Sequence, residues 1–240
     1  PQDPCSIPMD QTRGDKTNPK LDDGTSEAIA LSIPFTFYGK THQTAFVNNN
    51  GVISFDEPVR QYTPDPFPLA DGSPFVTPFW ADVDNVEGGD IFYRQSTDPA
   101  LLGDISQHIT QYFPESPFTA TWAFVATWDR VAYWGSKSDK VRPMNTSLTF
   151  IIIILRTRSG TISPPPPPSP PTCAGVPPSP AGFNSGDDTN FYNIPGSQTD
   201  AIINITTTSN VKVPGRWVFR VDDFQAPDVD PPQTDNNCWL

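Results

Sequence analysis

Residues 45–55 read AFVNNNGVISF, in which two apolar runs flank three asparagines and a glycine. Asn-Gly between apolar runs is a strong signal of a β-hairpin, because both residues tolerate the positive φ angles of a tight turn. The stretch therefore predicts two antiparallel strands joined at Asn50-Gly51. It sets the class of fold, because similar short runs separated by turn residues recur along the chain.

Alternation of apolar and polar residues predicts further strands at residues 29–33, 75–84, 91–94, 119–128 and 216–221. Pro78 favours an edge or a bulge in the strand at 75–84. One helix is predicted, capped by Asp98, opened by Pro99 and ended by Pro114. Together these elements predict a mostly β, sandwich-like domain with one short helix.

The composition disfavours several classes of protein. The 240 residues include 15 Lys+Arg and 27 Asp+Glu, so the net charge is −12 and the surface repels nucleic-acid phosphates. The longest apolar run, Leu148–Leu155, is about half as long as a bilayer requires, so no membrane span is expected in this chain. The chain begins at Pro1, which fits either a removed signal peptide or a fragment.

Several stretches, in a fixed order, resemble the extracellular nidogen-like (NIDO) domain family. They are VNNNGVISF at 47–55, TPDPFP at 63–68, PFWADVD at 78–84, IFYR at 91–94, AGFNSG at 181–186, TNFY at 189–192, PGS at 195–197 and SNVKVPGRWVFRVD at 209–222. LDDG at 21–24 and the stretch 119–134 are most similar to the alpha-tectorin type. The resemblance spans Leu21 to Asp222.

The resemblance implies a secreted glycoprotein module of the extracellular matrix or cell surface. Its implied function is non-catalytic support of cell–matrix adhesion and matrix glycoprotein assembly, with matrix glycoproteins or cell-surface receptors such as integrins as partners. The family offers no catalytic residue to carry over, and no cofactor is expected.

The alternative is a carbohydrate-binding or carbohydrate-active β-domain. Trp80, Asp82 and Asp84 would share one strand face, where two carboxylates suit glycoside chemistry. Four further tryptophans could line a sugar-binding face, although aromatic residues at alternating strand positions more often form core: Trp122, Trp128, Trp134 and Trp217. A third hypothesis is a truncated product that does not fold.

The chain departs from the family pattern between residues 148 and 180. In place of a further strand pairing it has Leu148–Leu155 and then ten prolines from Pro164 to Pro180. We therefore expect an exposed sheet edge, on which Ile151–Ile154 is an aggregation hazard. A variant transcript and a faulty gene model both account for this departure.

The predicted organisation has four parts. Residues 1–20 form a flexible polar arm and residues 21–222 a NIDO-like domain. The proline-rich segment 163–180, which favours polyproline II, interrupts that domain. Residues 223–240 form a disordered tail.

The arm contains Arg13-Gly14-Asp15, the tripeptide that integrins recognise. In that recognition the arginine reaches one receptor subunit, and the aspartate completes a metal shell on the other. An ordinary solvated turn is the alternative interpretation.

We expect no metal site, and four aspartates are the candidates if Ca²⁺ binds: Asp82, Asp84, Asp187 and Asp188. The spacing around Asp82 and Asp84 fails the EF-hand pattern, and caps at a strand end account for this pair. An Asx-turn accounts for Asp187 and Asp188.

Asn145 and Asn204 head N-x-S/T sequences and are glycosylation acceptors if the chain is secreted. No hydrolase, metalloprotease or nucleotide-binding motif accompanies His42 and His108, so we predict no enzyme. The disulfide pairing of three widely spaced cysteines stays open: Cys5, Cys173 and Cys238.

Overall fold

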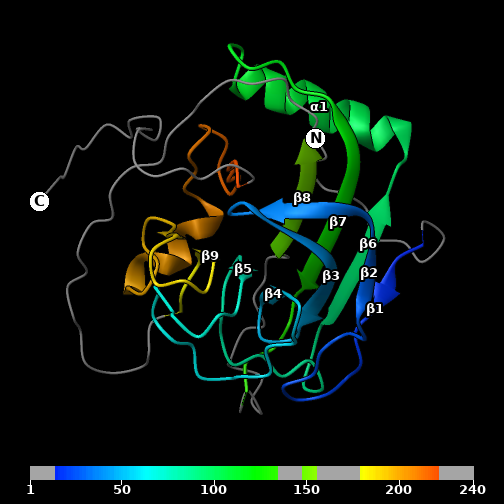
Figure 1. Cartoon of the computed structure of the whole chain (residues 1–240). Coiled ribbons are helices and arrows are strands. Elements are labelled where there is room, and N and C mark those ends of the chain that lie inside the picture. Colours follow the sequence, from blue (N-terminus) through cyan, green and yellow to red (C-terminus); the bar gives the residue numbers. More distant parts are fainter. Residues whose placement is uncertain (1–13, 135–147, 156–178, 222–240) are drawn as a thin grey trace, which may run out of the picture.

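The computed structural model describes residues 14–134, 148–155 and 179–221, with side chains in the first and last of these ranges (Figure 1). Its elements are β1 (Lys16–Thr17), β2 (Ile29–Phe37), β3 (Lys40–Asn48), β4 (Val52–Phe55), β5 (Phe75–Thr77), β6 (Asp90–Ser96), α1 (Pro99–Tyr112), β7 (Ala120–Asp129), β8 (Leu148–Leu155), β9 (Gly182–Asn184), β10 (Phe191–Asn193) and the 3₁₀ helix η2 (Asp200–Thr206). None of the helices in these ranges combines the length and the apolar character that a bilayer crossing requires.

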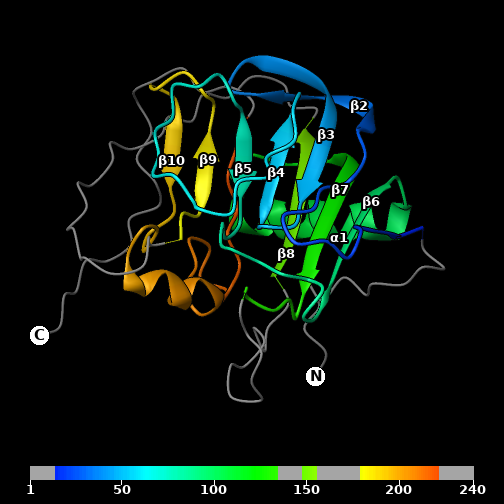
Figure 2. The ribbon, with the colours of Figure 1, turned by 90° about the horizontal axis from the view of Figure 1, so that it is seen from below.

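Two antiparallel sheets enclose the main core (Figure 2). One has the strand order β1-β6-β7-β8 and the other β10-β9-β5-β4-β3-β2. Large apolar side chains of both sheets meet between them, and they include Phe35, Phe37, Val47, Ile53, Phe55, Ile91, Trp122, Phe124 and Trp128. The predicted mostly β, sandwich-like fold is confirmed, and its core is rich in aromatic residues.

The predicted hairpin is formed by β3 and β4, but its loop is longer than the Asn50-Gly51 turn. Asn48 pairs with Val52, so the loop has three residues, and only Gly51 among them has a positive φ, of 84°. Three-residue hairpin loops place a glycine at such a left-handed position. The asparagines serve the fold differently, because their side chains bind neighbouring loops.

The strands predicted at 91–94 and 119–128 and the helix are also confirmed. β6 pairs with β7 along its whole length. Trp122 and Phe124 of β7 face the main core, whereas Ala123 packs with Ile105 of α1 on the opposite face. The Asp98 carboxylate caps the helix by accepting a hydrogen bond of 3.2 Å from the backbone N–H of Ala100.

One predicted strand is shorter than expected, and another is not a strand. The ladder of β5 ends at Thr77, because Pro78 has no N–H to donate, and the chain continues to residue 84 with one isolated bridge, from Val83 to Tyr133. Residues 216–221 join no ladder of the described sheets. Trp217 nevertheless packs against the main core. The apolar pattern therefore predicted correctly that this segment contacts the core, but its prediction of a paired strand was wrong.

Residues 14–20, which were predicted to be part of a flexible polar arm, belong to the folded domain. Lys16 and Thr17 form β1, which pairs with Tyr93 and Phe92 of β6. Asn18 is buried beside them. Polar side chains can be held in this way when the neighbouring strands supply hydrogen-bond partners.

The apolar run Leu148–Leu155 is strand β8, which pairs with β7 and is the last strand of its sheet among the described residues. Helix η2 was not predicted. Arg13, Asn145, the three cysteines, the tail 223–240 and residues 163–178 of the proline-rich segment lie outside the described residues.

Candidate functional site

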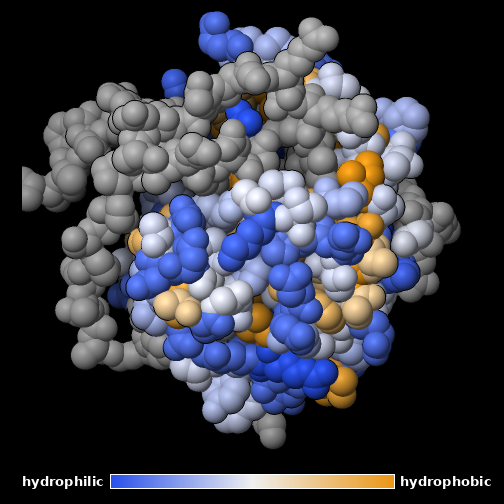
Figure 3. Space-filling view, in the orientation of Figure 1, coloured by the Kyte–Doolittle hydropathy of each residue, from blue (hydrophilic) through white to orange (hydrophobic). Residues whose placement is uncertain are grey.

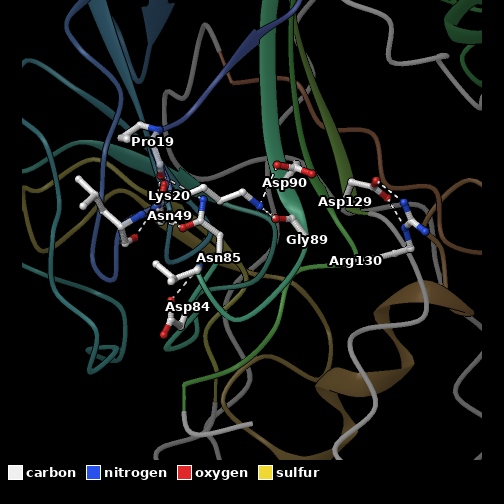
Figure 4. A network of polar contacts seen from close by, with 11 residues as sticks. Pro19, Lys20, Asn49, Asp84, Asn85, Gly89, Asp90, Asp129 and Arg130 are labelled. Carbon is white, nitrogen blue, oxygen red and sulfur yellow. Dashed lines mark hydrogen bonds and ion pairs between the residues drawn. The ribbon is translucent and has the colours of Figure 1, made fainter. Parts of the chain in front are cut away.

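The asparagines of the β3–β4 loop bind together the loops at one end of the sandwich. Figure 4 shows Asn49 beside Lys20 and Asn85. Asn49 is fully buried, and its Nδ2 donates to the carbonyl of Leu21 at 2.7 Å and to Oδ1 of Asn85 at 3.1 Å. Asn50 donates to a carboxylate oxygen of Asp23 at 2.7 Å and accepts from the backbone N–H of Val83. The hairpin loop therefore fixes the position of residues 18–24 relative to residues 79–85.

This arrangement brings three carboxylates together. One oxygen from each of Asp22, Asp23 and Asp82 lies within 4.8 Å of the others. Partial burial and then the charges of Asp23, Asp22 and Asp84 raise the pKa of Asp82 above its ordinary value. Burial, followed by the charges of Asp23 and Asp84, likewise raises the pKa of Asp22. The four aspartates therefore repel one another at neutral pH.

The arrangement differs from the predicted pair of Asp82 and Asp84. Asp84 is buried, and its Oδ1 accepts a 2.9 Å hydrogen bond from the N–H of Val86, so it caps the following turn. Asp82 instead joins Asp22 and Asp23, about sixty positions earlier in the chain. Carboxylate oxygens are ligands that Ca²⁺ prefers, and this trio is therefore the group of described residues best suited to hold one.

The second predicted pair, Asp187 and Asp188, lies in a loop of the six-stranded sheet. Asp187 accepts backbone hydrogen bonds from Thr189 and Asn190 and a side-chain bond of 2.6 Å from Asn190. Burial acts to raise the pKa of Asp187, but the hydrogen bonds from Ser185, Asn190 and Thr189 outweigh it and hold the pKa well below the ordinary value. The Asx-turn interpretation accounts for these contacts.

Replacing Asp82 with asparagine is expected to stabilise the fold at pH 7 by less than about 1 kcal/mol, because it removes one of several like charges at a partly exposed site. A carboxyl whose pKa is raised by folding binds its proton more tightly when folded. Its favourable contribution is therefore complete below the unfolded pKa and is lost as the pH rises through the folded one. The stabilisation of Asp82→Asn relative to wild type should therefore vanish near pH 3.5.

Urea denaturation of wild type and Asp82→Asn at pH 3.5 and pH 7 measures this difference. Asp104→Asn, which removes an exposed carboxylate on α1, is the matched control. An equal gain in both variants at pH 7 would contradict a local effect of the carboxylate trio. Repeating the melts with millimolar Ca²⁺ shows whether the ion relieves the same repulsion.

Four of the five most exposed large apolar side chains gather at the same end. Among the described residues, the large hydrophobic side chains with more than half of their surface exposed are Leu21, Tyr62, Val86, Trp134 and Ile203. Trp134 donates its backbone N–H to the carbonyl of Asp82, and Leu21 donates to Asn85, which precedes Val86. Tyr62 follows Gln61, whose carbonyl accepts a hydrogen bond from Asn50.

We call the end formed by Leu21, Asp22, Asp23, Tyr62, Asp82, Val86 and Trp134 the loop-end surface. The face of the molecule in Figure 3 is mostly hydrophilic, with small separate hydrophobic patches, as the acidic composition implies. Exposed apolar side chains that gather among polar groups often mark interaction sites, whereas single scattered ones do not. Sequence reasoning missed this surface, because its members come from four separate segments.

The tryptophans predicted for a sugar-binding face do not form one. Trp80 is 1% exposed, packs in a second core cluster with Phe67 and Phe75, and donates its indole N–H to the carbonyl of Gln61. It does not share a strand face with Asp82 and Asp84, because the ladder ends before it. Trp122 and Trp128 are buried in the main core, Trp217 is partly buried, and Trp134 alone of the four is exposed.

The described part of the integrin tripeptide is held against the four-stranded sheet. The carboxylate of Asp15 lies 2.6 Å from a guanidinium nitrogen of Arg94, and the two side chains are only 2% and 5% exposed. Gly14 is exposed with φ 85°. An integrin would therefore find the aspartate already paired.

Of the two glycosylation acceptors, Asn204 lies on η2 and is exposed, while Ile205, which follows it, is buried. The histidines lie on different elements, with His42 of β3 stacked on Phe55 and His108 of α1 stacked on Tyr112. The described residues thus bring no histidine to the loop-end surface.

Comparison with known proteins gives matches over most of the chain. The family of nidogen-like domains (NIDO) matches residues 43–162 and 172–223. Alpha-tectorin of Mus musculus is 43% identical over 229 residues, which cover 91% of this chain and 10% of that protein. Alpha-tectorin of Gallus gallus is 44% identical over 218 residues, 87% of this chain and 10% of that protein.

Nidogen-1 of Mus musculus is a more distant relative, 28% identical over 234 residues that cover 90% of this chain and 19% of that protein. The chain thus spans about a tenth of the length of the alpha-tectorins that it matches. No solved structure matches it.

Proposed function

The chain belongs to the nidogen-like (NIDO) domain family, and we propose on this basis that it supports cell–matrix adhesion and matrix glycoprotein assembly without catalysing a reaction. A nidogen-like domain is an extracellular-matrix module, and the family match carries the proposal. Its partners would be other matrix glycoproteins or cell-surface receptors.

The proposed mechanism is contact through the loop-end surface. Loops held on a rigid sheet scaffold are common binding sites, and here buried asparagine side chains fix the loops in place. The surface offers an exposed tryptophan, further apolar side chains and several carboxylates. A partner that fits it carries basic side chains beside an apolar patch, because opposite charge favours encounter and tryptophan favours affinity.

Replacing Trp134 with alanine is expected to weaken binding to such a partner about tenfold or more, as loss of an interface tryptophan commonly does. The measurement is biolayer interferometry of the purified chain against a panel of purified matrix glycoproteins, at two salt concentrations. Affinity should fall as salt rises, because the carboxylates act at the surface.

Ile203→Ala is the control, because Ile203 is even more exposed than Trp134 but lies on η2, outside the loop-end surface. Equal affinities for both variants and wild type would contradict the use of this surface. Binding confined to a glycan array, or turnover in a hydrolase screen, would favour the carbohydrate alternative instead.

Glycosylation is part of the proposal for a secreted module. The exposure of Asn204 supports its use as an acceptor, since a glycan there would project into solvent. The carbohydrate would lie on η2 beside exposed Ile203, which is not one of the loop-end residues defined above.

A further inference from the structure

We propose that Asn50 is a site of deamidation, which turns it into aspartate or isoaspartate and irreversibly weakens partner binding by the loop-end surface. The inference rests on the proposed function and adds a covalent regulation of the same surface. Asparagine followed by glycine, as at Asn50-Gly51, deamidates more readily than other asparagine sequences, because glycine has no side chain to hinder the reaction.

The reaction consumes only water. The backbone nitrogen of Gly51 attacks Cγ of Asn50 and forms a C–N bond, while its proton leaves with the side-chain NH2 group as ammonia. Water then adds to one of the two carbonyl carbons of the resulting five-membered imide and breaks the bond from that carbon to nitrogen. Opening at one carbonyl gives aspartate. Opening at the other gives isoaspartate, in which the main chain runs through the former side chain.

The fold itself requires this reactive dipeptide. Gly51 has φ 84°, and a Cβ atom there would lie 2.0 Å from the carbonyl oxygen of Phe79, so position 51 excludes other residues. Asn50 is also required, because its side chain donates to Asp23 and accepts from the backbone N–H of Val83. The sequence that holds the loops together is therefore also the one that is open to deamidation.

The native contacts keep Asn50 unreactive. The residue is 1% exposed, and its Nδ2 donates to the carboxylate of Asp23 at 2.7 Å and to the carbonyl of Gln61 at 3.3 Å. The attacking nitrogen is engaged as well, because Gly51 donates its N–H to the carbonyl of Asn48 at 3.1 Å. These hydrogen bonds must break before the imide forms, so the reaction proceeds from molecules in which the loop has opened locally.

Both products prevent the loop from closing again. An aspartate at position 50 has no amide to donate to Asp23, and it places a second carboxylate where the two groups were 2.7 Å apart. Asp22 and Asp82 lie beside Asp23, so like charges accumulate around a buried position. Isoaspartate instead lengthens the main chain of a three-residue hairpin loop. In either case residues 21–24 lose an attachment, and the loop-end surface loses its shape.

Asn50→Asp reproduces one product and is expected to weaken binding about tenfold or more to those glycoproteins of the interferometry panel that bind wild type. Hydrogen exchange of residues 18–24 should become faster in the same variant. Gln107→Glu is the matched control, because it makes the same change from amide to carboxylate at an exposed position on α1. Equal binding and equal exchange in the two variants would overturn the proposal.

Incubation of the purified chain at mildly alkaline pH tests whether the reaction occurs. Peptide mapping by mass spectrometry measures amide loss at Asn50, and an isoaspartyl methyltransferase assay detects isoaspartate. We expect amide loss to be about tenfold faster or more in urea than in buffer. Asp23→Gly should accelerate it about tenfold in buffer, because the amide loses a charged acceptor and glycine tolerates the φ of 52° at position 23. Asp22→Gly, which keeps that acceptor, should not accelerate it.

The comparison of wild type in buffer and in urea holds even if Asp23→Gly does not fold. Equal rates in the two solutions would overturn the protection by native contacts. Asn50 that stays intact in the native chain until exposed Asn204 has reacted would overturn its assignment as a modification site. Modified wild type that binds like fresh protein would overturn the effect on binding. Fresh wild type that binds no glycoprotein would instead contradict the proposed function, while amide loss and hydrogen exchange would still decide whether deamidation opens the loops.

Discussion

Gly51→Ala is expected to lower the free energy of unfolding by about 2–5 kcal/mol. A Cβ atom at this position would lie 2.0 Å from the carbonyl oxygen of Phe79, a backbone atom that cannot rotate away. Gly51 also has φ 84°, a left-handed conformation that costs other residues about 1–2 kcal/mol. Forcing an extra carbon into a packed site adds about 1–3 kcal/mol.

The substitution should affect the candidate site as well as stability. Gly51 lies next to Asn50, which holds Asp23 and Val83, so displacement of the loop disturbs the loop-end surface. We expect weaker partner binding by Gly51→Ala even under conditions in which the variant is folded.

Gly39→Ala separates the two causes of the effect. Gly39 also has a positive φ, of 73°, but no atom lies within 4 Å of the position that its Cβ would take. Gly39→Ala should therefore lower the free energy of unfolding by about 1–2 kcal/mol, from backbone conformation alone. Urea denaturation of both variants measures the difference, and equal losses would show that the approach of Phe79 is not a constraint.

The hairpin shows how far local sequence leads. Residues 45–55 predict their own strands, because alternation and turn propensity act within a few residues. The length of the turn was wrong, because Asn49 and Asn50 are committed to partners in distant loops, which a local pattern does not contain. The helix was predicted closely, because its start and stop signals are local. Asp98, Pro99 and Pro114 act on the adjoining backbone.

The candidate site was less accessible to prediction, because it depends on contacts between remote segments. Asp82 was recognised as a candidate ligand, but its neighbours Asp22 and Asp23 drew attention only as part of a family motif. Arg13-Gly14-Asp15 was noticed as a motif, whereas nothing near it in sequence indicates that Arg94, 79 positions away, pairs with its aspartate. Alternation on β6 marks which face Arg94 lies on, but it does not identify what crosses that face.

Asp15→Ala is expected to lower the free energy of unfolding by about 3–5 kcal/mol, because it leaves a buried guanidinium without its partner. Arg94 lies within β6, where it pairs with Val125 of β7, so it cannot reach water by fraying of a chain segment. Arg94→Met should be less destabilising, since the charge left behind is then on Asp15, beside a strand of only two residues. This asymmetry follows directly from where the two partners lie.

Thermal and urea denaturation of Asp15→Ala, Arg94→Met and the control Arg130→Ala measure the three losses. Arg130 is mostly exposed in its pair with Asp129, so its replacement should change the free energy of unfolding little. A loss for Asp15→Ala no larger than that of the control would mean that Arg94 is already hydrated, and would contradict a buried ion pair between these two side chains.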